Sequence, residues 1–157
     1  MAANPELYGK AIIRHLLPPN ERAIGPVEGA DIVLTFRNVH NWMARNEDEA
    51  FFNTFYDSLK PGGILGVVEH RAPDSASRQE MIDNGYVSEA FVKDATARAG
   101  FEFVASSEVN ANLKDTKDYA EGVWTLPPSY RLGDTDRAKY TAIGESDRMT
   151  LKFRKPL

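Results

Sequence analysis

One stretch of sequence, DIVLTFRNVHNWMARNEDEAFFNTFYDSLKPGGILGVVEHRAP from Asp31 to Pro73, decides the fold class of this chain. The apolar, β-branched run at residues 30–36 follows a glycine and predicts a strand covered on both faces, as in a parallel sheet. Asn46 is placed to cap a helix with an acidic first turn, which ends at Leu59 before a Lys-Pro-Gly-Gly turn. Residues 64–68 then form a second buried strand, so the stretch predicts a βαβ unit, the building block of parallel sheets.

The sequence before this unit predicts one helix and a connector. Residues 5–17 have apolar side chains at near-helical spacing, with Pro5 suited to the first turn and two prolines closing the helix. Residues 20–29 are irregular, with a short extended piece expected at Ala23 and Ile24.

The sequence after the unit continues the alternation of helix and strand. A helix is predicted at 88–99, a strand at 101–106, and a closing strand at 149–154 that could pair antiparallel. Residues 110–143 are rich in Asp, Thr, Pro and Tyr and predict a long insertion, with helical pieces at 115–121 and 135–142. The fold class is therefore α/β.

Length and composition limit the function classes. A chain of 157 residues, 42% hydrophobic and 27% charged, is long enough for one folded domain. Its net charge of −4, without a basic cluster, makes nucleic acid an unlikely partner and favours a small molecule. The chain has no cysteine for a disulfide, a thiolate metal site or a nucleophile. It has no secretory leader pattern and no apolar run of about 18 residues, so we expect a cytoplasmic protein without a membrane span.

The order of motifs resembles the second half of a class I S-adenosylmethionine-dependent methyltransferase. Residues 31–34 (DIVL) resemble that family's fourth strand, 59–63 (LKPGG) its turn into the fifth, and 99–101 (AGF) its entry to the sixth. The closing segments 124–128 (WTLPP) and 143–153 (IGESDRMTLKF) resemble a bacterial group of predicted methyltransferases. This resemblance implies a partial Rossmann-like sheet, made of strands four to seven with flanking helices.

The glycine-rich half that binds the cofactor in this family has no counterpart here. That half carries a Gly-x-Gly-x-Gly turn, but only Gly9, Gly25 and Gly29 precede the fourth-strand candidate, and they do not form such a turn. We therefore expect residues 1–29 to be an N-terminal helix and connector, and residues 30–157 a methyltransferase-like half-domain. S-adenosylmethionine is implied by the resemblance, for a chain that is truncated or depends on a partner.

The missing strands imply an exposed edge. With the family's strand order 3-2-1-4-5-7-6, the strand at 30–36 would lie at the edge of an apolar parallel sheet, which favours association. We expect residues 1–29 to fold over it, or a homodimer or partner chain to cover it.

The candidate site lies where two parallel strands end, because ligands bind at the carboxyl ends of such strands. His40 follows the first strand, and Glu69 and His70 end the second. The sequence His40-Asn41-Trp42 resembles the His-Asp-Trp motif of the branch that methylates phenolic hydroxyls, with Asn in place of Asp. The resemblance implies that His40 is the base and Glu69 the acid that orients it, and an imidazole can accept a proton near neutral pH.

Other side chains are candidates for binding substrate or cofactor: Arg37, Asn38, Trp42, His70 and Trp124. Structural interpretations stay open for most of the site: a loop cap for His40 and Asn38, a solvated loop residue for His70, and core for the two tryptophans. No recognised ligand spacing indicates a metal site.

Three functions are compatible with these residues. The first is O-methylation of a small hydroxylated molecule with His40 as base, and the second is a non-catalytic binding or dimerisation domain. The third is a small serine hydrolase or esterase using Ser75, Ser77 or Ser88, although no Gly-x-Ser-x-Gly elbow is present.

Overall fold

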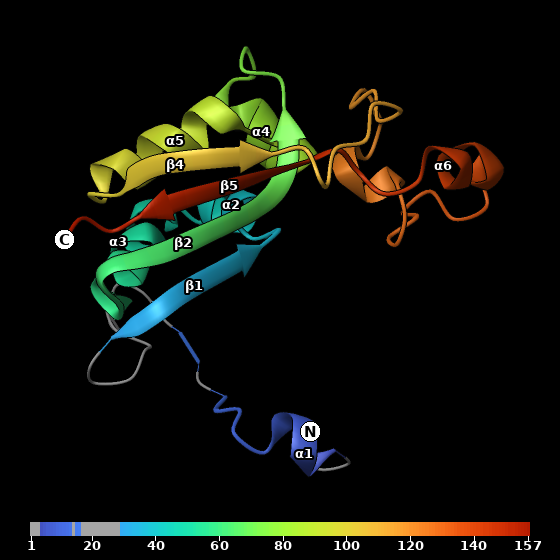
Figure 1. Cartoon of the computed structure of the whole chain (residues 1–157). Helices are drawn as coiled ribbons and strands as arrows, with labels where there is room; N and C mark the ends of the chain where they lie inside the picture. Colours follow the sequence, from blue (N-terminus) through green and yellow to red (C-terminus); the bar gives the residue numbers. More distant parts are fainter. Residues whose placement is uncertain (1–3, 14, 17–28) are drawn as a thin grey trace.

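The chain forms a mixed sheet with helices packed on one side (Figure 1). A computed structural model describes residues 4–13, 15, 16 and 29–157. The strand order is β1-β2-β5-β4, with β3 beside the end of β2. The strands are β1 (Ala30–Phe36), β2 (Leu59–Ala72), β3 (Val87–Ser88), β4 (Glu102–Ser107) and β5 (Arg148–Arg154). β1 and β2 are parallel, and β5 runs antiparallel to both of its neighbours. The α/β fold class is confirmed, and the strand order agrees with strands 4-5-7-6 of the resemblance.

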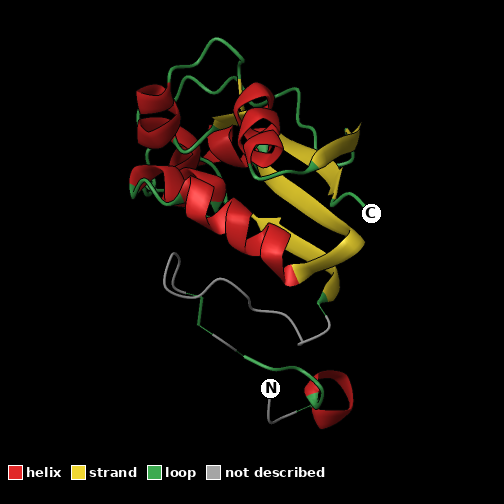
Figure 2. Ribbon diagram, turned by 90° about the vertical axis from the view of Figure 1, so that its left-hand side faces the viewer, coloured by secondary structure: helices red, strands yellow, loops and turns green. Residues whose placement is uncertain are grey.

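Four helices cover one face of the sheet (Figure 2). They are α2 (Val39–Ala44), α3 (Asp48–Ser58), α4 (Arg78–Asn84) and α5 (Glu89–Arg98). Alternate residues of β2, including Leu65 and Val67, are completely buried under these helices. Phe52 of α3 and Phe153 of β5 are completely buried as well. This period of two in burial is what a strand with one covered face produces.

The other face of β1 is open, which corrects the expectation of a strand covered on both faces. Ile32, Leu34 and Phe36 are 59%, 60% and 56% exposed, whereas Thr35 on the opposite face is buried. The local sequence is apolar at both parities, so it could not show that only one face receives helices. In the described part of the chain β1 pairs with β2 alone, so it lies at the sheet edge as expected.

Two short helices were absent from the prediction. α2 occupies what was expected to be a loop, and its six residues are too few to show a helical period. α4 has a capping box in which Ser77 and Glu80 exchange hydrogen bonds, and it ends at Gly85 in the left-handed conformation. Asn46 is not the cap of α3, because the helix begins one residue later than that assignment requires, with Glu47 as the N-cap.

The N-terminal helix is much shorter than predicted. α1 spans only Pro5–Tyr8, and Leu7, Ile12 and Ile13 are largely exposed. An amphipathic pattern stabilises a helix only when its apolar face packs against something. Leu16 at the end of the predicted helix is partly buried against the core, but Leu7 and Ile12 remain exposed. Leu17 and the connector, including the extended piece expected at residues 23–24, lie outside the described residues.

The insertion projects from the end of the sheet at which β1 ends (Figure 1). It contains a 3-10 helix, η1 (Gly122–Thr125), and α6 (Arg137–Ile143), whereas the helix predicted at 115–121 is absent. In place of a helix, the buried carboxylate of Asp115 organises this segment. It accepts hydrogen bonds from the Tyr86 hydroxyl and from the main-chain amides of Lys117 and Asp147. Within the described residues, no helix combines the length and the apolar character required to cross a bilayer.

Candidate functional site

A sharp turn at the end of β1 brings His40 over β2. Phe36 pairs with Val68, and the Arg37 amide donates a last hydrogen bond to the Val68 carbonyl at 2.8 Å. Arg37 then adopts a left-handed φ of 55°, and α2 starts two residues later. His40 therefore lies in the first turn of α2, next to Glu69 of β2.

Glu69 is completely buried, and both of its carboxylate oxygens accept hydrogen bonds. Oε2 accepts from the Val39 amide at 2.6 Å, and Oε1 accepts from the His70 amide at 2.9 Å. Nδ1 of His40 lies 3.2 Å from Oε1. A buried carboxylate needs such donors to offset its loss of hydration, and here the start of α2 supplies two of them.

The contact with Glu69 selects one tautomer of His40. A carboxylate accepts hydrogen bonds, so Nδ1 carries the proton in this contact. In the neutral ring, Nε2 is then the nitrogen with a free lone pair. The ring is thus held with one nitrogen assigned as donor and the other available to accept a proton.

His40 lines a hollow of about 370 Å³ at this end of the sheet. Arg37, Asn38, His70 and Trp124 line it as well, so the structure brings four of the five predicted binding residues together with His40. The ring of Trp124 meets that of His40 edge-on, with centroids 5.9 Å apart. The Asn38 side chain makes no capping bond to α2, although Asn38 is its N-cap.

Trp42 lies elsewhere. It is buried in the core, where its ring stacks on Phe51 at 4.3 Å and meets Phe52 and Phe55 edge-on. Trp42 does not line the hollow, because α2 turns this side chain toward α3. Its geometry is that of a core aromatic residue.

His70 forms a second polar wall of the hollow and is kept neutral. Burial, and then the nearby basic groups of His40, Arg37 and Arg148, lower its pKa from 6.5 to about 3. Its Nδ1 lies 2.5 Å from the hydroxyl of Ser146. A neutral His70 can exchange a hydrogen bond with this hydroxyl without adding positive charge to the hollow.

The insertion and the start of β5 complete the lining with residues that sequence reasoning did not select. They are Val123, Pro127, Pro128, Ser129, Glu145, Ser146 and Arg148. From the sequence, the polar run Glu145-Ser146-Asp147-Arg148 was only part of the resemblance at residues 143–153, with no role at the site. Pairing of His70 with Arg148 in the antiparallel register brings that run to the site. No local sequence signal reveals this register.

His40, Glu69 and His70 also have ligand atoms within 4.8 Å of one another, a spacing that could hold a metal ion. The hydrogen bonds of Glu69 favour another arrangement, because its oxygens already face two main-chain N–H groups and His40. A metal would have to displace donors that are buried with it. The geometry therefore favours a histidine–carboxylate pair over a metal centre.

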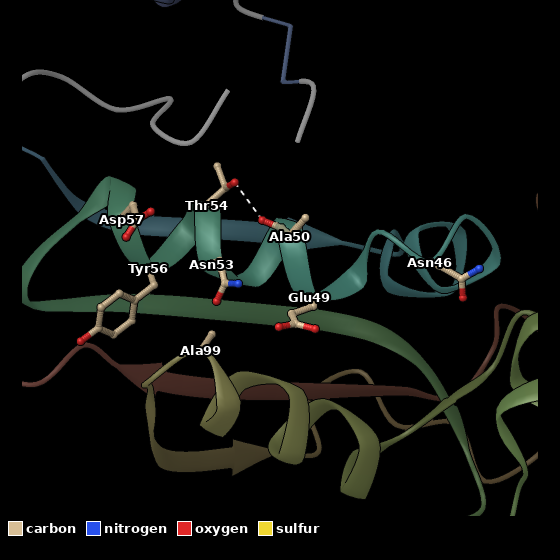
Figure 3. Close-up of a pocket in the computed structure, with 8 residues that line it drawn as sticks. All are labelled: Asn46, Glu49, Ala50, Asn53, Thr54, Tyr56, Asp57 and Ala99. Atoms are coloured by element: carbon tan, nitrogen blue, oxygen red, sulfur yellow. Dashed lines mark hydrogen bonds between the residues drawn. The ribbon is translucent and has the colours of Figure 1, made fainter. Parts of the chain in front are cut away.

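A larger hollow, of about 450 Å³, lies along α3 and the end of α5 (Figure 3). Its lining includes Glu49, Asn53, Thr54 and Asp57 of α3, together with Ala99, and the Thr54 hydroxyl donates a hydrogen bond to the Ala50 carbonyl. Its lining contains carboxylates but no histidine, serine or arginine. The hollow with His40 is the better candidate for chemistry despite its smaller volume.

Comparisons with known proteins identify the fold. No family model matches the sequence, and no curated protein matches it. The structure is similar to that of the [4+2]-cyclase SpnF, with a TM-score of 0.59 and 18% identity, over 99% of this chain and 61% of that one. It is also similar to a putative sarcosine dimethylglycine methyltransferase from Galdieria sulphuraria, with a TM-score of 0.51 and 12% identity, over 89% of this chain and 56% of that one. The chain spans less than two thirds of either protein and has part of the methyltransferase fold.

Proposed function

We propose that this chain carries the acceptor pocket and the general base of an S-adenosylmethionine-dependent O-methyltransferase acting on a small hydroxylated molecule. One observation carries the proposal: His40 lines the hollow while its Nδ1 faces the buried carboxylate of Glu69 at 3.2 Å. A ring oriented in this way is the arrangement that general-base catalysis requires.

His40 has a defined chemical role in this proposal. The acceptor hydroxyl gives its proton to Nε2 of His40 as the oxygen becomes a nucleophile. Glu69 keeps the proton on Nδ1 and stabilises the imidazolium that forms. The sulfonium cofactor supplies the methyl group, and this chain supplies the base and the walls that hold the acceptor.

The cofactor is bound by other polypeptide in this proposal. Neither of the two hollows described above has a glycine in its lining, so neither offers the close main-chain approach that a glycine-rich turn provides. Gly29 packs against Lys60 at the start of β1 and does not open onto the site. The described residues therefore do not fit the cofactor, and a second segment or chain must hold it.

The open face of β1 supports such a partner. Ile32, Leu34 and Phe36 form an exposed apolar row beside a strand edge that no described residue pairs with, which is a surface that favours association. A cofactor-binding partner chain at this edge would bring its ligand near the end of β1, where His40 lies. A second copy of this chain could cover the same row, and in that case the chain would act as a dimerisation domain.

The experiment pairs the chain with a cofactor-binding segment. If an in-frame or adjacent Gly-x-Gly-x-Gly segment is encoded upstream, co-expression is expected to give methyl transfer to hydroxylated small molecules. His40→Gln should lower this rate by about a hundred-fold or more. His15→Gln, at an exposed histidine outside the hollow, is the matched control.

Two results would refute the proposal. If the rate of methyl transfer is unchanged by His40→Gln, His40 is not the general base. The absence of any such segment, together with no heat on titration of the isolated chain with millimolar S-adenosylmethionine, would remove the methyltransferase assignment.

A hydrolase is the second candidate, and one observation favours it. The hydroxyl of Ser146 lies 2.5 Å from Nδ1 of His70, and both residues line the hollow. Ser77 and Ser88, which the sequence suggested, cap α4 and α5 instead. Turnover of a simple ester that is lost in Ser146→Ala would favour this activity, and a rate unchanged by that substitution would exclude Ser146 as nucleophile.

A further inference from the structure

We infer that the hollow binds an acceptor with an anionic group, of the class of small hydroxylated aromatic carboxylates, and that Arg37 and Arg148 hold its carboxylate. This inference deepens the proposed function and rests on it for the role of the hydroxyl. The carboxylate subsite is argued from the charges and donors that line the hollow.

Arg37 brings a cation to the hollow without a carboxylate to neutralise it. Its side chain is exposed, and it makes no ion pair or hydrogen bond within the described part of the chain. Its φ of 55° is uncommon for a residue with a side chain, and such conformations cluster at functional sites. The turn at the end of β1 thus directs a guanidinium to the mouth of the hollow.

Arg148 contributes a hydrogen-bond donor that the protein leaves unused. Its Nε is buried and has no partner among the described residues, although buried N–H groups are normally paired. Its Nη2 is bonded to Glu145 at 2.6 Å, so the guanidinium is held in place. The Nε atom itself has no contact with solvent, so a ligand carboxylate at the exposed part of this guanidinium reaches Nε after a small shift of the side chain and then supplies the missing acceptor.

The charges around the hollow favour an anion over a neutral or cationic ligand. Two arginines line it against one carboxylate, Glu145, which is already paired with Arg148. Glu69 is completely buried behind His40 and is saturated with donors. The two arginines also help to keep His70 neutral, which indicates that both cations act on the same small region.

The size and the apolar walls indicate the rest of the ligand. A volume of about 370 Å³ is at the small end of the range for small-molecule sites. Phe36 and Trp124 line it beside Pro127 and Pro128, so part of this mainly polar hollow offers apolar surface to a ring. The combination of cation, apolar wall and histidine matches a molecule with a carboxylate, a ring and a hydroxyl.

The test compares 3-hydroxybenzoate with its neutral analogue 3-hydroxybenzamide, using the folded chain. Binding to the unmodified chain and to every variant is measured by isothermal titration calorimetry. In the unmodified chain it is also followed by nuclear magnetic resonance of the Nε–H group of Arg148, which should shift with the carboxylate and much less with the amide. Arg37→Gln and Arg148→Gln should each weaken 3-hydroxybenzoate binding by about ten-fold or more. Arg45→Gln on α2 and Arg154→Gln on β5 remove equally charged but half-exposed side chains outside the hollow, and should leave binding unchanged.

The outcomes separate this inference from the proposed function. Equal affinity for the two compounds, no shift with either, or equal losses in the control variants would overturn the anion subsite. Selective binding of the carboxylate that depends on Arg37, with no methyl transfer in the reconstituted system, would support the subsite while the proposed function fails. Methyl transfer to neutral phenols alone would support the function and overturn the subsite.

Discussion

Replacing Glu69 with glutamine is predicted to destabilise the protein, although the two side chains have almost the same shape. Both carboxylate oxygens accept from main-chain N–H groups, at 2.6 Å from Val39 and 2.9 Å from His70. A glutamine has one oxygen and one NH₂ group, so either orientation places a donor against a buried donor. One buried N–H group then loses its acceptor in every rotamer.

The expected cost follows from that single lost acceptor. A buried donor left unsatisfied costs about 1–3 kcal/mol, and the upper half of that range applies because the lost acceptor is charged and inaccessible to water. A loss of about 2 kcal/mol is a large part of the 5–15 kcal/mol typical of a folded domain. The substitution should therefore be visible in stability even if the protein stays folded.

Urea unfolding, followed by the fluorescence of Trp42 and Trp124, measures this difference. The matched control is Glu102→Gln, at a half-exposed residue paired with Arg154, which should change stability by less than about 0.5 kcal/mol. If Glu69→Gln also stays within about 0.5 kcal/mol of the unmodified chain, the hydrogen bonds described for this carboxylate do not form, and the orientation of His40 loses its basis.

Two further predictions concern pH and backbone conformation. Burial and then neighbouring basic groups lower the pKa of His70 from 6.5 to about 3. The unfolded chain therefore takes up a proton that the folded chain excludes, and stability should fall as pH drops from 6.5 toward 3, by up to about 1.4 kcal/mol per pH unit. His70→Gln should flatten this decline in urea titrations at pH 7 and about 5, and an equal slope in both proteins would contradict the shift. Gly122→Ala should destabilise the chain by about 1–3 kcal/mol more than Gly133→Ala. Both glycines have positive φ, but only at Gly122 would a Cβ lie 2.4 Å from a main-chain atom, the carbonyl oxygen of Asn84. Equal melting temperatures of the two variants would show that this close approach is not rigid.

The elements that the sequence predicted well are those with local signals. The strand at Ala30–Phe36 agrees with its prediction, and α5 and β4 lie within one residue of theirs. Apolar runs and regular apolar spacing are signals within a few residues and need no distant partner. The length of α1 was predicted wrongly, because a helix of this kind depends on distant contacts. Its apolar residues have helical spacing, but Leu7 and Ile12 remain exposed and do not pack on the core.

The candidate site divides in the same way. The sequence by itself determined that His40 and Glu69 follow neighbouring parallel strands, because chain direction and strand length locate both residues at one end of the sheet. Only the tertiary structure decided that Trp42 turns into the core, while Trp124, Ser146 and Arg148 form the opposite wall. Ser146 and Arg148 reach His70 through the antiparallel pairing of β5 with β2, which joins segments 76 residues apart in the case of Ser146, whereas Trp124 comes from η1. Such a register depends on packing over the whole sheet, and no short sequence pattern encodes it.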